Sequence, residues 1–360
     1  MTRRLSLFLT LFVFLAACFP TPEQPNPTSA PIKLTETPSM PPEPTSQPFP
    51  EAFAAARALG RGINLGNALE APSEGEWGVV IREEYFDLIR QAGFNSVRIP
   101  VRWNAHAAES SPYTIDPAFF ARVDQVTNWA LKRDLVVIID FHHYLELIAD
   151  PQGHRERYLA LWKQIAEHYQ DYPSTVLFEL LNEPDDTIGA SGWNDIATQA
   201  LTVIRASNPE RNVVIGGVNW NSYDQLQSLA LPENDRHLIA TFHYYLPFQF
   251  THQGADWAEG SEAWLGTSWD ATEAEKAAVT ANFDEVAAWA KTNNRPVLLG
   301  EFGAYSRAEL DSRARWTAFV AREAEKRGFA WAYWEFCAGF GVYDPLTKRW
   351  REPLLKALIP

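Results

Sequence analysis

The chain has 360 residues, of which 46% are hydrophobic, and its formal net charge at pH 7 is −14. This negative charge argues against nucleic acid or another polyanion as a partner, whereas a neutral polymer would be indifferent to it. Only two cysteines are present, Cys18 and Cys337, which excludes a disulfide framework and a cysteine-rich metal site.

Residues 1–17 have the order of a signal peptide. Two arginines precede an apolar run (5–15) that is too short to span a bilayer as a helix. The run ends in LAAC, which resembles the lipobox of bacterial lipoproteins, where the cysteine is lipidated after cleavage. We therefore expect export, with a lipid anchor on Cys18 at the extracellular face; a plain secretory signal cut near Ala17 is the alternative.

Residues 18–50 are rich in Pro, Thr and Ser. Such a segment has too little apolar surface to offset its chain entropy, so we expect an extended tether there. Residues 51–360 are enough for one large domain with its own core.

Short apolar runs alternate with segments of helical period along residues 51–360. Two helical segments are 119–132 and 155–169, each with an apolar stripe. Strands that are apolar on both faces and separated by amphipathic helices predict a parallel sheet covered by helices. Eight such units fit a (β/α)8 barrel better than an open sheet, and no Gly-rich phosphate loop follows the first run. The eight runs are 62–66, 95–100, 135–141, 176–181, 212–218, 238–242, 296–300 and 330–334.

Polar and aromatic side chains lie at the end of nearly every run, which is the end of a barrel strand where chemistry takes place. Glu183 and Glu301 follow the fourth and seventh runs and would face each other across the barrel mouth, as the two carboxylates of a glycosidase do. Aromatic rings suit the apolar faces of sugars, and amide, imidazole and guanidinium groups suit their hydroxyls. The other side chains at these ends are Arg98, His142, His143, Asn182, Trp220, His243, Tyr245 and Trp334.

Other site types fit the sequence less well. His142 and His143 are neighbours that should point to opposite faces of a strand, and no HExxH spacing is present, so we expect no metal and no other cofactor. No G-x-S-x-G nucleophile elbow occurs. Glu179 lies four residues before Glu183, about 13 Å lower at about 3.3 Å per residue, and should be a structural residue of the barrel interior. Glu335 should pack outside the mouth.

Seven segments together resemble the strand-end motifs of glycoside hydrolase family 5, the family of cellulases and endoglucanases: GINLGNALE, VRIPVRW, IDFHHY, LLNEP, FHYY, GEFGAY and YWEF. The resemblance covers about residues 55–358. Its details look closest to thermophilic bacterial endoglucanases, some of which also cut mannans. It implies a retaining endo-β-1,4-glucanase that acts on cellulose-type and mixed-linkage β-glucans and also on glucomannan or mannan.

The resemblance also implies roles for individual residues. Glu183 would be the acid/base and Glu301 the nucleophile, while Asn182 would hold the 2-hydroxyl of the reacting sugar. Arg98 and Tyr245 would keep the nucleophile ionised. The remaining implied substrate-binding residues are Asn67 and Glu70 for the next sugar on the non-reducing side, His142, His143 and His243 in the pocket, Trp334 under the reacting sugar, and Trp220, His252 and Trp257 along the cleft.

Two alternatives remain open. The main activity could be that of an endo-β-1,4-mannanase, since glucose and mannose differ only at C2. A carbohydrate-binding lipoprotein with an inactive barrel is the other, and the presence of both Glu183 and Glu301 argues against it. In either enzyme the partner is a β-linked polysaccharide, and we expect a monomer.

Overall fold

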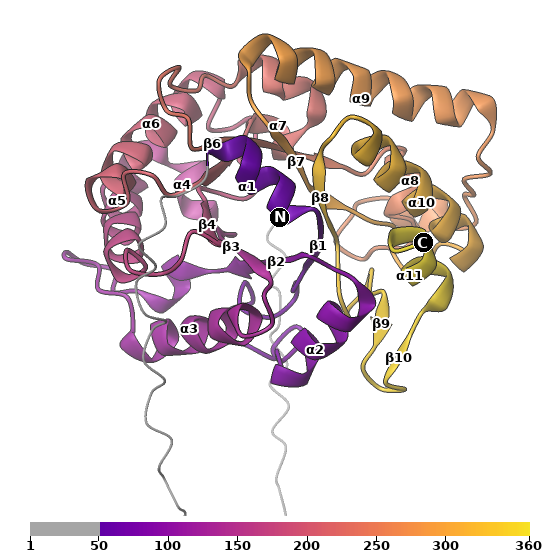
Figure 1. The fold of residues 1–360 in the computed structure, drawn as a ribbon, viewed down its shortest axis with the longest axis horizontal. Coiled ribbons are helices and arrows are strands. Elements are labelled where there is room, and N and C mark those ends of the chain that lie inside the picture. Colours follow the sequence, from indigo (N-terminus) through magenta and orange to yellow (C-terminus); the bar gives the residue numbers. More distant parts are fainter. Residues whose placement is uncertain (1–50) are drawn as a thin grey trace, which may run out of the picture. The chain divides into compact units, whose positions relative to one another are not determined.

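The computed structural model describes residues 51–360, so the expected signal peptide, Cys18 and the tether lie outside the described residues. Within this part of the chain, eight parallel strands close into a barrel in the order β1 to β8, and helices surround it (Figure 1). The predicted (β/α)8 barrel is confirmed. No helix of residues 51–360 is long and apolar enough to cross a membrane.

Each barrel strand overlaps one of the eight predicted apolar runs. The strands are β1 (Arg61–Asn64), β2 (Ser96–Val101), β3 (Val136–Phe141), β4 (Val176–Glu179), β5 (Val213–Gly216), β6 (Leu238–Tyr244), β7 (Val297–Phe302) and β8 (Ala330–Tyr333). The ends differ: β4 and β5 stop two residues before the predicted ends, whereas β6 and β7 continue two residues beyond them. A short hairpin of β9 (Tyr343–Asp344) and β10 (Arg349–Trp350) follows the barrel.

The longer helices pack their apolar stripes against the outside of the barrel, and most of the short ones lie at its ends (Figure 1). In α3, Asp116 caps the N-terminus by accepting the Ala118 N–H, and Pro117 occupies the first turn. The predicted helical segments 119–132 and 155–169 are thus confirmed as parts of α3 and α5. The helices are α1 (Ala52–Leu59), α2 (Glu83–Ala92), α3 (Pro117–Leu131), α4 (Leu145–Ala149), α5 (Pro151–His168), α6 (Ala190–Ser207), α7 (Val218–Asn221), α8 (Phe248–Thr251), α9 (Glu273–Asn293), α10 (Leu310–Lys326) and α11 (Glu352–Leu358).

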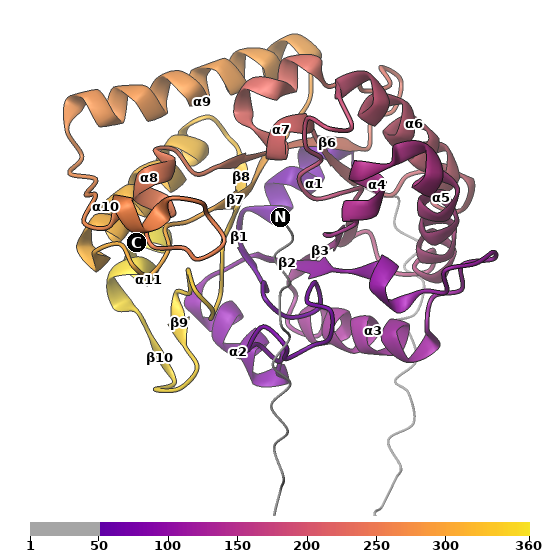
Figure 2. The ribbon, with the colours of Figure 1, turned by 180° about the vertical axis from the view of Figure 1, so that it is seen from behind.

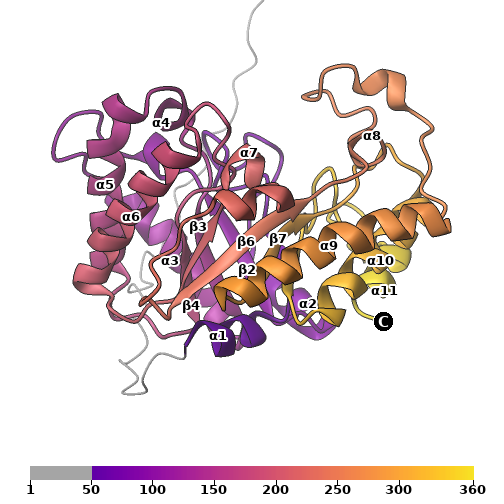
Figure 3. The same ribbon diagram turned by 90° about the horizontal axis from the view of Figure 1, so that it is seen from above.

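Helix α1 closes the end of the barrel at which the strands begin. Its buried face, with Leu59 fully buried, packs on residues from the starts of six strands, among them Val136, Val214 and Leu298. Helices α4, α7 and α8 lie at the opposite end, as Figures 2 and 3 show. Because α1 fills one end with apolar side chains, only the end where the strands finish is open for a site.

Candidate active site

Glu301 lies in β7 near the open end of the barrel and is 4% exposed. One of its carboxylate oxygens accepts a hydrogen bond from Arg98 Nη1 at 2.7 Å, and the other accepts one from the Tyr245 hydroxyl at 2.9 Å. Both partners are the ones expected from the sequence. Two donors on one carboxylate favour its ionised form.

Arg98 forms the centre of a buried polar layer below Glu301. Its guanidinium donates to both oxygens of Glu179, at 2.7 and 3.0 Å, and lies 3.0 Å from Asp140 Oδ2. It also donates to Asn64 Oδ1 at 3.0 Å and to Asn182 Oδ1 at 2.9 Å. Glu179 is fully buried, which confirms it as an interior residue, yet it shares one guanidinium with Glu301 instead of being remote from the site.

Glu183 follows β4, as expected from its place after the fourth apolar run. Strand β4 ends at Glu179, and Glu183 has a left-handed φ of 47°. Leu180 and Asn182 still donate backbone hydrogen bonds to Val214 and Phe141 of the neighbouring strands, and the Leu180 carbonyl also accepts side-chain hydrogen bonds from Tyr158 and Trp162, at 2.8 and 3.2 Å. The chain turns away from the sheet only at Glu183. This bend turns Glu183 toward the barrel axis, where 27% of its side chain is exposed.

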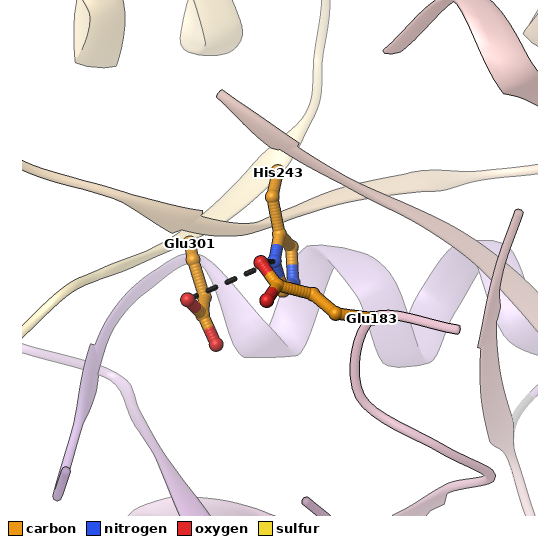
Figure 4. Close-up of side chains that lie close together, drawn as sticks. All are labelled: Glu183, His243 and Glu301. Carbon is orange, nitrogen blue, oxygen red and sulfur yellow. Dashed lines mark hydrogen bonds and ion pairs between the residues drawn. The ribbon is translucent and has the colours of Figure 1, made fainter. Parts of the chain in front are cut away.

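His243, from β6, lies between the two glutamates (Figure 4). Its Nδ1 is 2.7 Å from Glu183 Oε1 and 3.7 Å from Glu301 Oε2. One carboxylate oxygen of each glutamate and a ring nitrogen of His243 all lie within 4.8 Å of one another. The two predicted catalytic carboxylates are therefore brought together, with an imidazole as their common neighbour.

Burial dominates the ionisation of these groups. It raises the pKa of Glu183 to about 7, against the effect of the Arg98 charge. It also raises the pKa of Glu301 to about 7, while His243, Arg98 and the Tyr245 hydroxyl act in the lowering direction. Burial lowers the pKa of His243 to about 4, so its imidazole is neutral near pH 7. Since Glu301 has direct contacts with Arg98 and Tyr245, we take Glu301 as the member of the pair that ionises first.

Glu183, His243 and Glu301 are also spaced as the ligands of a metal ion could be. Both oxygens of Glu301 already accept hydrogen bonds, from Arg98 and Tyr245. The fixed positive charge of Arg98, 2.7 Å from the same carboxylate, opposes a second cation there. The donor set therefore suits two interacting carboxylates better than a cation.

Strand alternation led us to expect His142 and His143 on opposite faces, and this expectation is wrong. Strand β3 ends at Phe141, so the alternation stops before the pair, and the two ring centroids are only 4.6 Å apart. The His142 ring is parallel to that of Trp334 at 5.5 Å, and its Nδ1 is 2.5 Å from Asp140 Oδ2. Both histidines thus belong to the mouth, and Trp334 stands beside His142; its place under the reacting sugar stays a prediction.

Asn67 and Glu70 lie on the loop after β1. Glu70 is 1% exposed, and its two oxygens accept the backbone N–H groups of Asn67 and Ala68. In this structure Glu70 therefore holds the loop that presents Asn67, which has a left-handed φ of 63°. Direct contact of either side chain with a sugar stays a prediction.

The three residues expected along the cleft occupy the surrounding loops. Trp220 and Trp257 are 58% and 60% exposed, as suits rings that receive a sugar. His252 is buried, and its ring lies 5.0 Å from that of Tyr245. Sugar binding by all three remains a prediction from the sequence.

A comparison with protein families matches residues 60–339 to the cellulase family, glycosyl hydrolase family 5. The chain belongs to this family. It is a glycoside hydrolase, as the sequence predicted.

Solved structures and curated relatives that are similar to this family 5 enzyme agree with the family assignment. Cel5A of Thermotoga maritima in complex with cellobiose is 52% identical, with a TM-score of 0.85, and the match covers 86% of this chain and all of that chain (100%). The same protein with mannotriose gives 52% identity and a TM-score of 0.84, with 86% and 100% covered. Endoglucanase H of Acetivibrio thermocellus is 41% identical over 339 residues, which are 92% of this chain but 36% of that protein. This chain therefore spans little more than a third of that relative's length.

Several residues of this family 5 site were missed in the sequence. Asp140 and Asn64 are fully buried partners of Arg98, and a charged residue within the apolar run of β3 was the available signal for Asp140. Trp77, which is 42% exposed and 5.9 Å from the His143 ring, lies on a loop for which no periodic pattern exists. Glu335, in contrast, was named in the sequence as a residue that packs outside the mouth; it is fully buried, and its carboxylate accepts backbone N–H groups, including that of Cys337.

Proposed function

We propose that this glycoside hydrolase is a retaining endo-β-1,4-glucanase in which Glu183 is the acid/base and Glu301 the nucleophile. The observation that carries the proposal is the separation of the carboxylates, which have oxygens within 4.8 Å of each other. Retaining enzymes hold their carboxyl groups about 5–5.5 Å apart, whereas inverting enzymes need about 6.5–9.5 Å to admit a water molecule between them. The short separation favours retention.

In the first step, the ionised Glu301 attacks the anomeric carbon while Glu183 gives its proton to the leaving glycosidic oxygen. In the second step, Glu183 takes a proton from water, the water oxygen bonds to the anomeric carbon, and Glu301 leaves as a carboxylate. Arg98 and Tyr245 stabilise the charge of Glu301 before the first step and after the second. The raised pKa of Glu183 keeps a proton available near pH 7.

The substrate we propose is a soluble β-1,4-linked glucan, including mixed-linkage glucan, with glucomannan and mannan as additional substrates. Cel5A of Thermotoga maritima, 52% identical, has been seen with cellobiose and with mannotriose, which supports both sugar types. A panel of carboxymethylcellulose, barley β-glucan, lichenan, glucomannan, galactomannan and xylan should show activity on the glucans and glucomannan. Activity confined to xylan would overturn the proposal.

The mechanism is tested by the anomer released and by trapping the intermediate. Proton NMR of early products should show the β-anomer, and a 2-fluoro glycoside with an activated leaving group should label Glu301. Glu183→Gln should lose activity on polysaccharide but keep the first step with an activated aryl glycoside, which needs little protonation. An α-anomer first, or a label on Glu183 or Glu179, would reject the assignment.

We also propose that the enzyme is exported and anchored through a lipid on Cys18, with residues 18–50 as the tether. The support is the order of the N-terminal sequence, two arginines, an apolar run and LAAC. Cys18→Ala should move the enzyme from the membrane fraction to the soluble fraction without changing its specific activity. A wild-type protein found free in solution would contradict the anchor and favour the plain secretory signal.

A further inference from the structure

Three successive residues after β5 have a backbone conformation that non-glycine residues rarely adopt. Asn219, Trp220 and Asn221 have left-handed φ values of 54°, 55° and 55°. The left-handed region costs about 1–2 kcal/mol per residue, and a side chain other than that of Asn or Asp enters it seldom. Strain of this kind persists where neighbouring structure holds it, and it concentrates at functional sites. This turn takes Asn221 into the barrel, where it is fully buried.

The buried amide of Asn221 reaches the histidine between the two carboxylates. Its Nδ2 lies 3.4 Å from His243 Nε2, and the other ring nitrogen, Nδ1, lies 2.7 Å from Glu183 Oε1. Backbone pairing reinforces the arrangement, because Ser222 forms a parallel bridge with His243. Asn221, His243 and Glu183 thus form a chain of contacts that ends on the acid/base.

Two glycines leave the space that this chain of contacts needs. A Cβ atom on Gly216 would lie 2.1 Å from Asn221 Oδ1, and one on Gly300 would lie 3.0 Å from His243 Nε2. Any larger residue at Gly216 would push the Asn221 amide away. The Asn221 side chain can therefore lie beside the imidazole only because residue 216 has no side chain.

We propose that Asn221 is a positioning residue that fixes the ring proton of His243 on Nδ1 and thereby sets the proton affinity of Glu183. A neutral imidazole has one donor and one acceptor nitrogen. An amide N–H directed at Nε2 makes Nε2 the acceptor, so the N–H at Nδ1 faces Glu183 and stabilises its carboxylate form. This inference rests on the proposed acid/base role of Glu183, which the same experiment checks separately.

Other charged groups also face these residues, and they stay unchanged when Asn221 is substituted. Arg98 on β2, Glu179 on β4 and Glu301 on β7 act on both His243 and Glu183. His142 also interacts with His243, and Asp140 interacts with Glu183. A shift caused by Asn221→Ala, which adds no charge, is therefore assigned to the imidazole and not to this background.

The test uses Asn221→Ala, which removes the donor and adds no charge, and Asn221→Asp, which keeps the shape but replaces the donor by an acceptor with a negative charge. The pH profile of kcat/KM is measured with an aryl cellobioside whose poor leaving group needs the Glu183 proton. Asn221→Ala should move the basic limb upward by about one pH unit, the equivalent of about one hydrogen bond, and Asn221→Asp should move it upward by at least as much, because the added negative charge acts in the same direction. Because Asp tolerates the left-handed region as Asn does, Asn221→Asp keeps the fold testable if Asn221→Ala does not fold.

A second readout reports the tautomer directly. In the wild type, ¹⁵N NMR of the imidazole rings should show His243 protonated at Nδ1, and Asn221→Asp should move that proton to Nε2; His243→Gln identifies the signals. Asn294→Asp is the matched control, because Asn294 also has a left-handed φ, 50°, but follows α9 at the closed end of the barrel. It should leave both readouts unchanged.

An unmoved or lowered basic limb in both Asn221 variants, or an Nε2-protonated His243 in the wild type, overturns the inference. A shift of the same size in Asn294→Asp also overturns it. Glu183→Gln is run alongside these variants. If the pH profile of kcat/KM of Glu183→Gln still has the same basic limb, the proposed acid/base role of Glu183 fails, whatever the Asn221 variants show.

Discussion

Arg98 has a single positive charge and lies within 3.0 Å of carboxylate oxygens of Asp140, Glu179 and Glu301. One guanidinium cannot balance three buried negative charges, so the layer is more stable when it holds protons. Burial accordingly raises the pKa of Asp140 to about 7 and raises that of Glu179. Glu179 also accepts two hydrogen bonds from Arg98, but only Glu301 of these three accepts one from the Tyr245 hydroxyl, and this additional donor favours its ionised form during turnover.

Tyr245→Phe tests this control of the nucleophile. The variant removes the 2.9 Å hydrogen bond to Glu301 and leaves the ring in place. A hydrogen bond to a charged group contributes about 1.5–3 kcal/mol, so kcat/KM should fall about 10- to 100-fold near pH 6. The pKa of Glu301 should rise, which moves the acid limb of the pH profile upward.

Tyr244→Phe is the control for this prediction. Tyr244 is the adjacent residue on β6, but its hydroxyl accepts from Asn282 Nδ2 and its ring packs on Phe283, outside the barrel. Its loss should leave the acid limb where it is. An equal shift in both variants would show that the limb reports general loosening of β6 and not ionisation of Glu301.

At the scale of the elements, α1 and the starts of the strands form a separate apolar core that supports the site from below. Ala52, Ala55, Ala56 and Leu59 pack on the strand residues at the closed end. Small alanines let the helix approach closely, and Leu59 supplies most of the buried volume. Removing this contact should affect stability more than chemistry.

We expect Leu59→Ala to destabilise the fold by about 2–5 kcal/mol, because a fully buried leucine leaves a cavity. Differential scanning calorimetry should show a Tm lower by about 5–15 °C. At temperatures well below the Tm, kcat/KM should stay within about two-fold of the wild type, since α1 lies at the opposite end from Glu301. Phe53→Ala, on the same helix but 37% exposed, should cost less than about 1 kcal/mol. Equal losses of stability in the two variants would contradict the central role of Leu59 in this apolar core.

For the whole molecule, the number of buried carboxyl groups makes stability depend on pH. Burial raises the pKa of Glu70 to about 8, and raises that of Asp140, Glu183, Glu301 and Glu335 to about 7 each. Between the unfolded pKa values, about 4.5, and these folded values, the native state binds more protons than the unfolded state. The free energy of unfolding therefore falls as pH rises through this range.

The Tm should accordingly decrease by about 5 °C or more between about pH 5.5 and about pH 8.5. Glu70→Gln should make the decrease shallower above about pH 6.5, because the group with the highest of these pKa values no longer titrates. Glu259→Gln, on an exposed loop, should leave the slope unchanged. A Tm that is constant or rises over this range would show that these carboxyl groups are already ionised in the folded protein.

The sequence by itself determined the barrel fold and most of the residues at its open end. Eight doubly apolar runs separated by helical stripes leave few folds, and Glu183, Glu301 and Tyr245 could be selected because they follow run ends, whereas the role of Arg98, inside the second run, came from the family resemblance. These are local signals, since burial on both faces and the end of a strand are both visible in a short stretch of residues.

Only the tertiary structure decided how these residues interact. The segment before Glu183 is held by backbone hydrogen bonds to Val214 and Phe141 and by Tyr158 and Trp162 of α5, which bind the Leu180 carbonyl; all are contacts between distant segments. The partnership of Asn221 with His243 depends on left-handed backbone after β5 and on room left by glycines in two strands. Strand alternation could not reveal either arrangement, because Glu183 and Asn221 lie beyond the ends of β4 and β5, where the rule no longer holds.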